Sequence, residues 1–576
     1  MAMHRGRTIP LIVAGVLLFS ACGQQEPPLI PPEGDDAARE ATATACSPVT
    51  IGAQEFVPAQ PEPIEPPRGA GEPDEEGLNE EIPPPVPDSG VDIGDLTESV
   101  FAPPRGAEGE ERPEDAVVYV HSTVRDPSVS PQVEPEVASN GDRVLMTWNF
   151  NAGVSNDGGN SFRYLSPSTT FPDKSEDFWG DQRAEYSATH DIWLWVLMYR
   201  KDEAGKNIIR LGVAPGDSVF DGARGTYYDW DIENTGFPAQ VQSWFDQPKI
   251  GLSARHAFLS FNAYGSLGEG FQGSLVIRVA LDGLASGGDP QARCFLPGIN
   301  PATSRQFFSP YPTRGAADTM YFAAHQDNQT LAIWRWRDDE DTVSFRTVVD
   351  SFAWPMGTDY DDNSRSDFSC VRVIRGADGS VSESDPTSNW CLRLSDGWAK
   401  NDSRITSGWA GGGRIGFAWN IPSYDNPANP GVEVPYPAVW AVRIDEATLD
   451  ACSQAECIVD HPWLVNEGYA IQYAAIAPNA RGDLGAVVLT GGGSSRHDGY
   501  LTCMAAIWDQ YSGGTWHYLD IAESNDDVSR PSSGDYLGIW PNGGNDATWS
   551  AGCMTFEAGF GDVVQFARFA RRQDIP

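Results

Sequence analysis

The chain has 576 residues, a formal net charge of −42 at pH 7 and 40% hydrophobic residues, enough for one large domain or two to three ordinary ones. The charge argues against nucleic acid as a partner, because a phosphate-binding surface needs clusters of Lys and Arg and the sequence has none. Such acidity is typical of an exported soluble protein. The many carboxylates are available to bind a structural Ca²⁺ ion, although no EF-hand-like loop is present. We expect no other cofactor.

The first 22 residues predict an export signal. Basic Arg5 and Arg7 precede an apolar run from Ile9 to Phe19 that is too short for a stable membrane span. The ending LFSAC resembles the lipobox of bacterial lipoproteins, in which the cysteine, here Cys22, is lipidated and becomes the new N-terminus. The resemblance implies an outer-membrane lipoprotein that faces the periplasm or the cell surface, with the membrane as a partner through its acyl chains. An ordinary cleaved signal peptide is the alternative.

Residues 23–114 differ in composition from the rest of the chain. They are rich in proline and acidic residues, as in EEIPPPVPDSG, and poor in aromatic residues. Because such a segment has little apolar surface to bury, it predicts a disordered linker that acts as a stalk between the anchor and the folded part.

Residues 115–576 contain a repeated phrase, in which a polar start leads into a short strand, a turn and a strand rich in aromatic residues. Seven copies begin at Glu134, Asp181, Asp246, Ser309, Ser403, Ile471 and Gly534, and the longest interval, after Ser309, is interpreted as an insertion. Many strands without amphipathic helices predict an all-β fold, a β-propeller with seven blades. Six blades and an irregular sandwich are the alternatives. The strand at Val117 is expected to close the ring by pairing with the last blade near VVQFARFAR.

The stretch VSNDGGNSF matches the pattern S-x-D-x-G-x-x-F, with its four positions at Ser155, Asp157, Gly159 and Phe162. In a hairpin, Asp157 can accept backbone N–H groups, the glycine permits positive φ, and Phe162 packs the turn onto a blade. The pattern resembles the Asp-box, or BNR repeat, of sialidase-like β-propellers. In that family the motif lies away from the catalytic face, so the resemblance implies the fold and a structural role for these residues.

Active sialidases use an arginine triad for the substrate carboxylate, a Tyr–Glu nucleophilic pair and an Asp acid. The first arginine normally stands in an R-I-P phrase just before the first Asp-box. The only RTIP here lies within the signal, from Arg7 to Pro10. The sequence therefore favours binding over sialidase activity.

Propellers present ligand groups from the starts of their innermost strands, around the mouth of the central channel. Alignment of the seven starts predicts candidate ligand-binding residues Glu136, Arg183, Lys249, Tyr311, Arg404 and Tyr473, and candidate catalytic residues Asp181, Asp246, Asp535 and Tyr536. Arginines and tyrosines beside carboxylates suit an acidic or polyhydroxylated sugar. The alternative is a hydrogen-bonded network that lines a wet channel without a ligand.

Zinc-ligand spacing, a G-x-S-x-G elbow and a phosphate-binding glycine loop are missing from the sequence, so no metal is expected. Nine cysteines minus Cys22 leave eight, an even number in an exported chain. The preferred disulfides are Cys370–Cys391, Cys452–Cys457 and Cys503–Cys553, with Cys46–Cys294 as the remainder.

Together these features predict an envelope-anchored lipoprotein whose propeller binds a glycan or an envelope protein without catalysis. An exo-glycosidase of sialidase type is the alternative, and a purely structural part of an envelope assembly is the third hypothesis.

Overall fold

The structure is a computed structural model of the chain. It describes residues 44–45, 49–56, 62–63, 112, 114–125, 133–171, 178–220, 225–233, 235, 237, 243–265, 270–354, 373–375, 381–383, 403–422, 424–425, 433–434, 436–451, 455–466, 468–492, 500–526, 536–542, 547–558 and 561–575. The expected lipidation site, Cys22, lies outside these residues.

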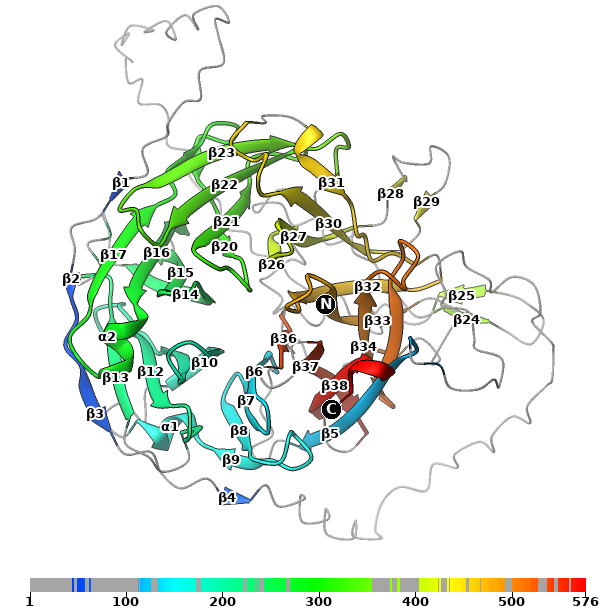
Figure 1. Cartoon of the computed structure of the whole chain (residues 1–576), viewed down its shortest axis with the longest axis horizontal. Coiled ribbons are helices and arrows are strands. Elements are labelled where there is room, and N and C mark those ends of the chain that lie inside the picture. The colour runs from blue at the N-terminus through cyan, green and yellow to red at the C-terminus, as the bar shows by residue number, and fades with distance from the viewer. Residues whose placement is uncertain are drawn as a thin grey trace, which may run out of the picture. The chain divides into compact units, whose positions relative to one another are not determined.

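Seven antiparallel sheets follow one another around a centre, with the first strand of each sheet innermost (Figure 1). The sheets are numbered here as blades 1 to 7. Blade 1 holds β6 (Pro135–Asn140), β7 (Arg143–Trp148), β8 (Asn151–Ser155) and β9 (Arg163–Leu165); blade 2 holds β10 (Phe178–Ser187), β11 (Ile192–Tyr199), β12 (Ile209–Pro215) and β13 (Gly225–Trp230); blade 3 holds β14 (Ser243–Leu252), β15 (His256–Gly265), β16 (Phe271–Ala280) and β17 (Gln291–Leu296).

The remaining blades repeat the arrangement. Blade 4 holds β20 (Tyr311–Pro312), β21 (Thr319–His325), β22 (Thr330–Arg337) and β23 (Val343–Val349); blade 5 holds β26 (Ile405–Gly411), β27 (Arg414–Ile421), β30 (Ala438–Asp445) and β31 (Ile458–Asp460); blade 6 holds β32 (Ala470–Pro478), β33 (Leu484–Gly491), β34 (Thr502–Trp508) and β35 (His517–Glu523); blade 7 holds β36 (Gly538–Pro541), β37 (Thr548–Glu557), β38 (Gly561–Arg571) and β5 (Ala116–Arg125). The predicted seven-bladed β-propeller is therefore confirmed.

Elements outside the blades are short. Among the described residues they include the helices α1 (Pro167–Thr170) and α2 (Leu281–Ala285) and the 3-10 turns η3 (Ala455–Cys457) and η5 (Arg572–Asp574). They also include small hairpins: β18 (Ile299–Asn300) with β19 (Arg305–Gln306), β24 (Val373–Arg375) with β25 (Val381–Glu383), and β28 (Tyr424–Asp425) with β29 (Glu433–Val434). The β24–β25 hairpin lies in the interval that the sequence marks as an insertion.

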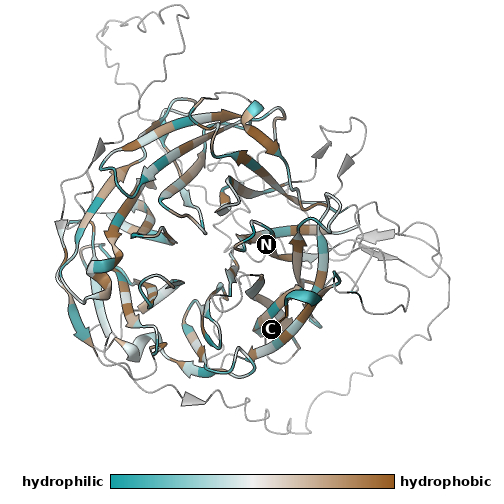
Figure 2. Ribbon diagram, in the orientation of Figure 1, coloured by the Kyte–Doolittle hydropathy of each residue, from teal (hydrophilic) through white to brown (hydrophobic). Residues whose placement is uncertain are grey.

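The blades are held together by apolar strands that are buried on both faces. Every residue of β11, with the sequence IWLWVLMY, is buried, as expected for a strand covered by neighbouring blades. Figure 2 shows brown, hydrophobic stretches recurring along the strands all around the ring. Most of the largest fully buried side chains are tryptophans, among them Trp195, Trp409 and Trp549.

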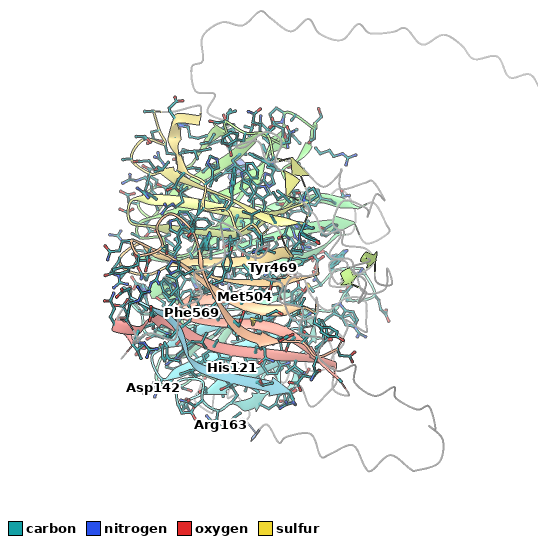
Figure 3. The ribbon with its side chains drawn as sticks, turned by 90° about the vertical axis from the view of Figure 1, so that its right-hand side faces the viewer. His121, Asp142, Arg163, Tyr469, Met504 and Phe569 are labelled. Atoms are coloured by element: carbon teal, nitrogen blue, oxygen red, sulfur yellow. A yellow bond between two sulfur atoms is a disulfide. The ribbon has the colours of Figure 1, made fainter. Side chains whose placement is uncertain are left out.

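Closure of the ring joins the first and the last described parts of the propeller. β5 pairs antiparallel with β38, with Val124 opposite Val564 and His121 opposite Ala567. Figure 3 shows this seam from the side, with His121 and Phe569 labelled on the two strands. The pairing predicted for the strand at Val117 is confirmed.

Part of the expected stalk is built into the propeller. We call the described residues of 44–63 the strap: β1 (Thr44–Ala45) and β2 (Val49–Thr50) pair with β17, β3 (Gln54–Phe56) pairs with β13, and β4 (Glu62–Pro63) pairs with β9. The strap thus adds to the outer edges of blades 3, 2 and 1, and the expectation of disorder throughout 23–114 is wrong there. Within the strap, the run TIGAQEF supplies apolar anchors. Ile51 and Phe56 are buried, and the Phe56 ring centroid lies 4.6 Å from that of Phe171.

The VSNDGGNSF stretch forms the turn between β8 and β9, as the local chemistry predicts. Asp157 Oδ1 accepts the backbone N–H of Ser161 at 2.9 Å, and Ser155 Oγ accepts that of Gly159 at 2.8 Å. Gly159 has φ +88°, and a Cβ there would lie 1.9 Å from the Phe566 ring of blade 7. The turn therefore locks the seam between blades 1 and 7. Membership of the Asp-box family stays a prediction.

One predicted disulfide, Cys503–Cys553, is present and joins β34 to β37 across blades 6 and 7. Cys294 and Cys457 are also disulfide-bonded. Cys46, Cys370, Cys391 and Cys452 lie outside the described residues, so the other three pairings stay predictions.

Candidate functional site

Irregular starts of the innermost strands shape the centre of the propeller. The pairing register shifts between Phe178 and Gln182 in β10, between Asp246 and Lys249 in β14, and again near the starts of β26 and β32. Gln247 lies inside one of these bulges with φ 51°. A bulge breaks the strict alternation of a strand and redirects the side chains beside it, which explains how successive polar residues reach one place.

Six of the ten predicted rim residues line a single hollow, which we call the channel-mouth hollow. Its lining consists of Asp181, Arg183, Gln247, Lys249, Tyr311, Arg404, Ile405, Thr406 and Tyr536, which come from blades 2, 3, 4, 5 and 7, and it holds about 340 Å³ including space open to solvent. The structure therefore brings these six residues together, while their role in binding stays a prediction.

Arg183 is held on three sides. Its Nη1 lies 3.2 Å from Glu136 Oε2, its Nε donates to the Pro248 carbonyl at 2.9 Å, and its Cζ lies 3.4 Å from the centroid of the Tyr536 ring. The other oxygen of Glu136 accepts from Arg314 Nη2 at 2.8 Å. Glu136 is completely buried behind the hollow, so its place is that of a positioning group for two guanidinium groups rather than a lining residue.

Sequence reasoning missed three members of this network: Glu134, Glu185 and Arg314. Arg314 Nε lies 3.3 Å from Glu185 Oε1, and both side chains are buried. Burial raises the pKa of Glu185 to about 8, although Arg314 opposes that shift. Glu185 stands two residues after Arg183 in the regular part of β10, where alternation places both on one face of the strand. That spacing is the signal that could have found it.

Glu134 and Asp181 form a coupled carboxyl pair. Burial raises the pKa of Glu134 well above its ordinary value, and the Asp181 charge raises it further. Burial also raises the pKa of Asp181, while Arg183 and a hydrogen bond from Glu134 oppose that shift. Two carboxyl groups this close do not both ionise readily, so the pair retains a proton more easily than separate groups would.

Asp246 and Lys249 meet near the same point with pKa values shifted toward each other. Burial, followed by the charge of Asp181, raises the pKa of Asp246 to about 7. Burial, followed by repulsion from Arg404 and Arg183, lowers the pKa of Lys249 to about 7. Lys249 Nζ donates to the Gln247 carbonyl at 3.2 Å. Three basic side chains thus lie near Asp246, a carboxyl group that is only partly ionised near neutral pH.

Of the remaining candidates, Tyr536 lines the hollow and Tyr473 does not. The hydroxyl of Tyr536 lies 3.2 Å from the Gln182 carbonyl oxygen, and burial, followed by the charge of Glu134, raises the pKa of Tyr536 well above its ordinary value. Tyr473 does not line the hollow: it is buried in an apolar cluster with its backbone N–H bound to Asn420 Oδ1 at 2.8 Å. Asp535 lies outside the described residues.

Within the residues that the structure describes, no group of three or more His, Cys, Asp or Glu side chains could hold a metal ion. Across the same residues, no helix is long and apolar enough to cross a membrane.

The fold and the site define a seven-bladed β-propeller with an ionisable hollow at its centre. No protein-family model and no curated protein matches the chain. Similar solved structures include an α-L-arabinofuranosidase of Fusarium graminearum (10% identity, 78% of this chain and 97% of that chain, TM-score 0.33) and the sialidase of Trypanosoma rangeli (8% identity, 78% and 60%, TM-score 0.33). A lignostilbene dioxygenase of Pseudomonas brassicacearum is equally similar (10% identity, 70% and 74%, TM-score 0.33). With TM-scores below 0.5, these likenesses say nothing about activity.

Proposed function

We propose that this chain is an exported, lipid-anchored propeller that binds the carboxylate of an acidic glycan in the channel-mouth hollow, without hydrolysing it. The observation that carries the proposal is that Arg183, Lys249 and Arg404 line one hollow, where burial, followed by repulsion from Arg404 and Arg183, lowers the pKa of Lys249 to about 7. An anionic group placed among these three cations offsets their repulsion, and guanidinium groups offer paired donors that match a carboxylate.

The acids around the hollow do not cancel this attraction. Glu136 is committed to Arg183 and Arg314. Burial raises the pKa of Asp246 to about 7, so this group carries less than full charge near neutral pH. Burial also raises the pKa of Glu134, well above its ordinary value, and that of Asp181. Partly protonated carboxyl groups and tyrosine hydroxyls can also hydrogen-bond sugar hydroxyl groups, as donors and acceptors. An acidic sugar therefore fits the hollow better than a neutral one does.

Tyr536 argues against sialidase-type catalysis. A tyrosine nucleophile needs activation by a lowered pKa or a neighbouring base. Here burial raises the pKa of Tyr536, its hydroxyl is bonded to the backbone of Gln182, and Arg183 covers one face of its ring. Nothing in this arrangement prepares the phenol for attack on a sugar.

One observation favours the second candidate, an exo-glycosidase. Asp246, with a pKa of about 7, could protonate a leaving group at neutral pH, as the general acid of a glycoside hydrolase does. Such an enzyme would need a second carboxylate as base or nucleophile, for which Asp181, which lines the hollow and whose charge acts on Asp246, is the candidate.

The binding test uses the full chain and oligosaccharides that end in an acidic sugar, compared with the same oligosaccharides after reduction of the carboxylate to an alcohol. Lys249→Met removes the charge and keeps most of the volume. Lys206→Met is the matched control, because Lys206 is paired with Glu233 and does not line the hollow. We expect saturable binding to the acidic form that falls at least about tenfold in Lys249→Met and is unchanged in Lys206→Met.

Equal binding of the acidic and reduced forms would refute a carboxylate site. Release of sugar from a fluorogenic acidic glycoside, lost in Asp246→Asn, would replace the binding function with the hydrolase. If neither binding nor turnover occurs, a protein partner at the envelope becomes the leading hypothesis.

The anchor rests on the LFSAC resemblance alone and has its own test. Mass spectrometry of the N-terminal peptide from the exported chain should find an acylated Cys22. An unacylated N-terminus at any other residue would remove the lipid anchor from the proposal and leave the hollow untouched.

A further inference from the structure

A second cavity lies between blades 5 and 6, away from the channel-mouth hollow. It is lined by Trp409, Gly411, Gly412, Arg414, Arg443, Arg481, Gly482 and Leu484 and holds about 410 Å³ including space open to solvent. Arg404, in the first hollow, immediately precedes β26, whereas Gly411 ends it. Seven extended residues span about 20 Å, so the two sites lie at opposite ends of this strand. We call the second one the arginine cavity.

All the charged side chains that line the arginine cavity are positively charged. It contains three guanidinium groups and no carboxylate. Arg443 makes a bidentate ion pair with Asp460, and Arg481 pairs with Asp483 and Asp574. These carboxylates flank the cavity without entering its wall. A guanidinium has five N–H donors, so Arg443 in particular retains donors beyond those that Asp460 uses.

Arg414 is the uncompensated group. No hydrogen bond or ion pair joins its side chain to any residue that the structure describes. Its cross-strand neighbour is Asp445, but Asp445 Oδ1 accepts the backbone N–H groups of Ala447 and Thr448, at 2.9 and 3.2 Å. Arg414 is half-buried and lines the cavity together with two other guanidinium groups, so an anion bound in the cavity would supply the charge that Arg414 lacks as a partner.

Trp409 supplies an independent sign of a missing acceptor. Its side chain is 1% exposed, it lines the cavity, and its indole N–H has no hydrogen-bond partner among the described residues, a feature it shares with four other tryptophans. A buried donor left without an acceptor costs about 1 to 3 kcal/mol. Another buried indole, that of Trp549 in blade 7, donates to the Ala477 carbonyl at 3.0 Å.

Glycines keep the cavity open on its backbone side. Gly412 and Gly482 have φ values of +62° and +82°, and a Cβ on Gly482 would lie 3.0 Å from the Gly412 Cα. A Cβ on Gly411 would lie 2.8 Å from Pro478. Side chains are thus excluded where the two hairpins approach each other, and a ligand can come close to the backbone.

We propose that the arginine cavity binds a small oxyanion, a phosphate or sulfate group, through Arg414, Arg443, Arg481 and the indole N–H of Trp409. A tetrahedral oxyanion accepts several hydrogen bonds at once and matches the paired donors of guanidinium groups. The group is either free in solution or carried as an ester at the end of a glycan. The strongly negative chain repels extended polyanions at long range, which favours a single oxyanion over a polymer of them.

The test is calorimetric titration of the full chain with sodium sulfate, sodium phosphate and N-acetylglucosamine 6-sulfate, with chloride keeping the ionic strength at about 0.15 M. Arg414→Gln removes the uncompensated charge. Arg255→Gln is the matched control: Arg255 is exposed in the corresponding hairpin of blade 3, between β14 and β15, and lines neither cavity. Trp409→Phe removes the indole donor and keeps an aromatic ring. Thermal unfolding checks that each variant is folded.

We expect saturable binding of an oxyanion, weakened at least about tenfold in Arg414→Gln and unchanged in Arg255→Gln. Weaker binding in folded Trp409→Phe would add the indole to the site. Tighter binding of the sulfated sugar than of sulfate identifies an ester as the ligand, and the reverse identifies the free ion. Binding that Arg414→Gln leaves unchanged, or stabilisation by sulfate that never saturates and is equal in all variants, overturns the proposal. None of these results depends on the acidic-glycan site, where Lys249→Met is the test.

Discussion

The channel mouth is lined by ionisable side chains, whereas the seams between the blades consist of aromatic rings and glycines. At the mouth, ionisable side chains such as Arg183 and Lys249 are crowded where burial works against their charge. At the seams, aromatic rings of one blade lie against glycines of the next: a Cβ on Gly485 of blade 6 would lie 2.6 Å from the Trp549 ring of blade 7. The seams therefore set the stability of the fold. At the mouth, by contrast, burial opposes the charge of Lys249 and lowers its pKa to about 7.

The largest expected effect is at the seam between blades 1 and 7. In Gly159→Ala, the new Cβ would meet the Phe566 ring at 1.9 Å, at a backbone φ of +88°. Overpacking and left-handed strain together should lower the free energy of unfolding by about 4 kcal/mol. Gly141→Ala is the matched control, because its φ is +60° but a Cβ there meets nothing within 4 Å. Urea unfolding should show a loss of only about 1 kcal/mol for the control, and equal losses would contradict the packing argument.

The next effect is at the seam between blades 6 and 7. Replacing both Cys503 and Cys553 by Ala removes the disulfide that joins β34 to β37. The free energy of unfolding should fall by about 3 kcal/mol, mostly because the unfolded chain gains freedom. Denaturant titration under oxidising conditions measures the change. An unchanged midpoint would mean that the apolar packing around β34 and β37 holds this seam without the bond.

A smaller effect is expected at the strap. Phe56→Ala removes a ring that packs against Phe171 and lies 6.1 Å from Tyr227. At an outer edge, where neighbours can relax, this should cost about 2 kcal/mol, less than in the centre of a core. Glu55→Gln, an exposed change on the same strand, is the control. Limited proteolysis should cleave the strap faster in Phe56→Ala than in wild type, and equal rates would show that the strap is held by its backbone pairing alone.

Sequence patterns predicted the apolar part of this molecule better than its polar network. Repeated strand phrases sufficed for the seven blades and for the closing strand at Val117, because alternation and length are local properties. Arg183, Lys249 and Arg404 were placed at the mouth because each stands near the start of a repeat. Arg314 was missed because the innermost strand of blade 4, β20, is only two residues long. Arg314 lies after the end of that strand, whereas the prediction considered only residues near the starts of the repeats. Tyr473 was misplaced because a bulge turned it into the core.

The strap shows a second limit of composition. Averaged over residues 23–114, proline and acidic residues dominate and predict disorder. Edge strands need only a few apolar anchors, since pairing with the outer strand of a blade supplies hydrogen-bond partners along one side of their backbone. Two such anchors, Ile51 and Phe56, are too few to change the average, but they are enough to hold a short strand.

The smallest expected effect is a pH dependence that reports on the mouth alone. Lys249 must be protonated to attract a carboxylate, and its pKa of about 7 means that this charge is lost as pH rises from 6 to 8. Asp246, with a pKa of about 7, gains negative charge over the same range and acts in the same direction. Glycan affinity should therefore fall about tenfold between pH 6 and pH 8. In Lys249→Met the residual dependence should come from Asp246 and from Glu134 and Glu185, whose pKa values are also raised, and it should become weaker when Asp246→Asn is added.

The free energy of unfolding should also depend on Asp246 and Lys249: it should fall with rising pH below about pH 7 and increase with rising pH above it. Between its unfolded pKa and about 7, Asp246 binds more protons folded than unfolded, so stability falls as pH rises toward 7. Above 7, the unfolded Lys249 holds its proton longer than the folded one, so stability rises with pH toward the unfolded pKa of lysine. Lys249→Met should abolish that rise and stabilise the protein near pH 7 while weakening the glycan. A variant that loses both stability and binding would show that Lys249 supports the fold, as the residues of the seams do.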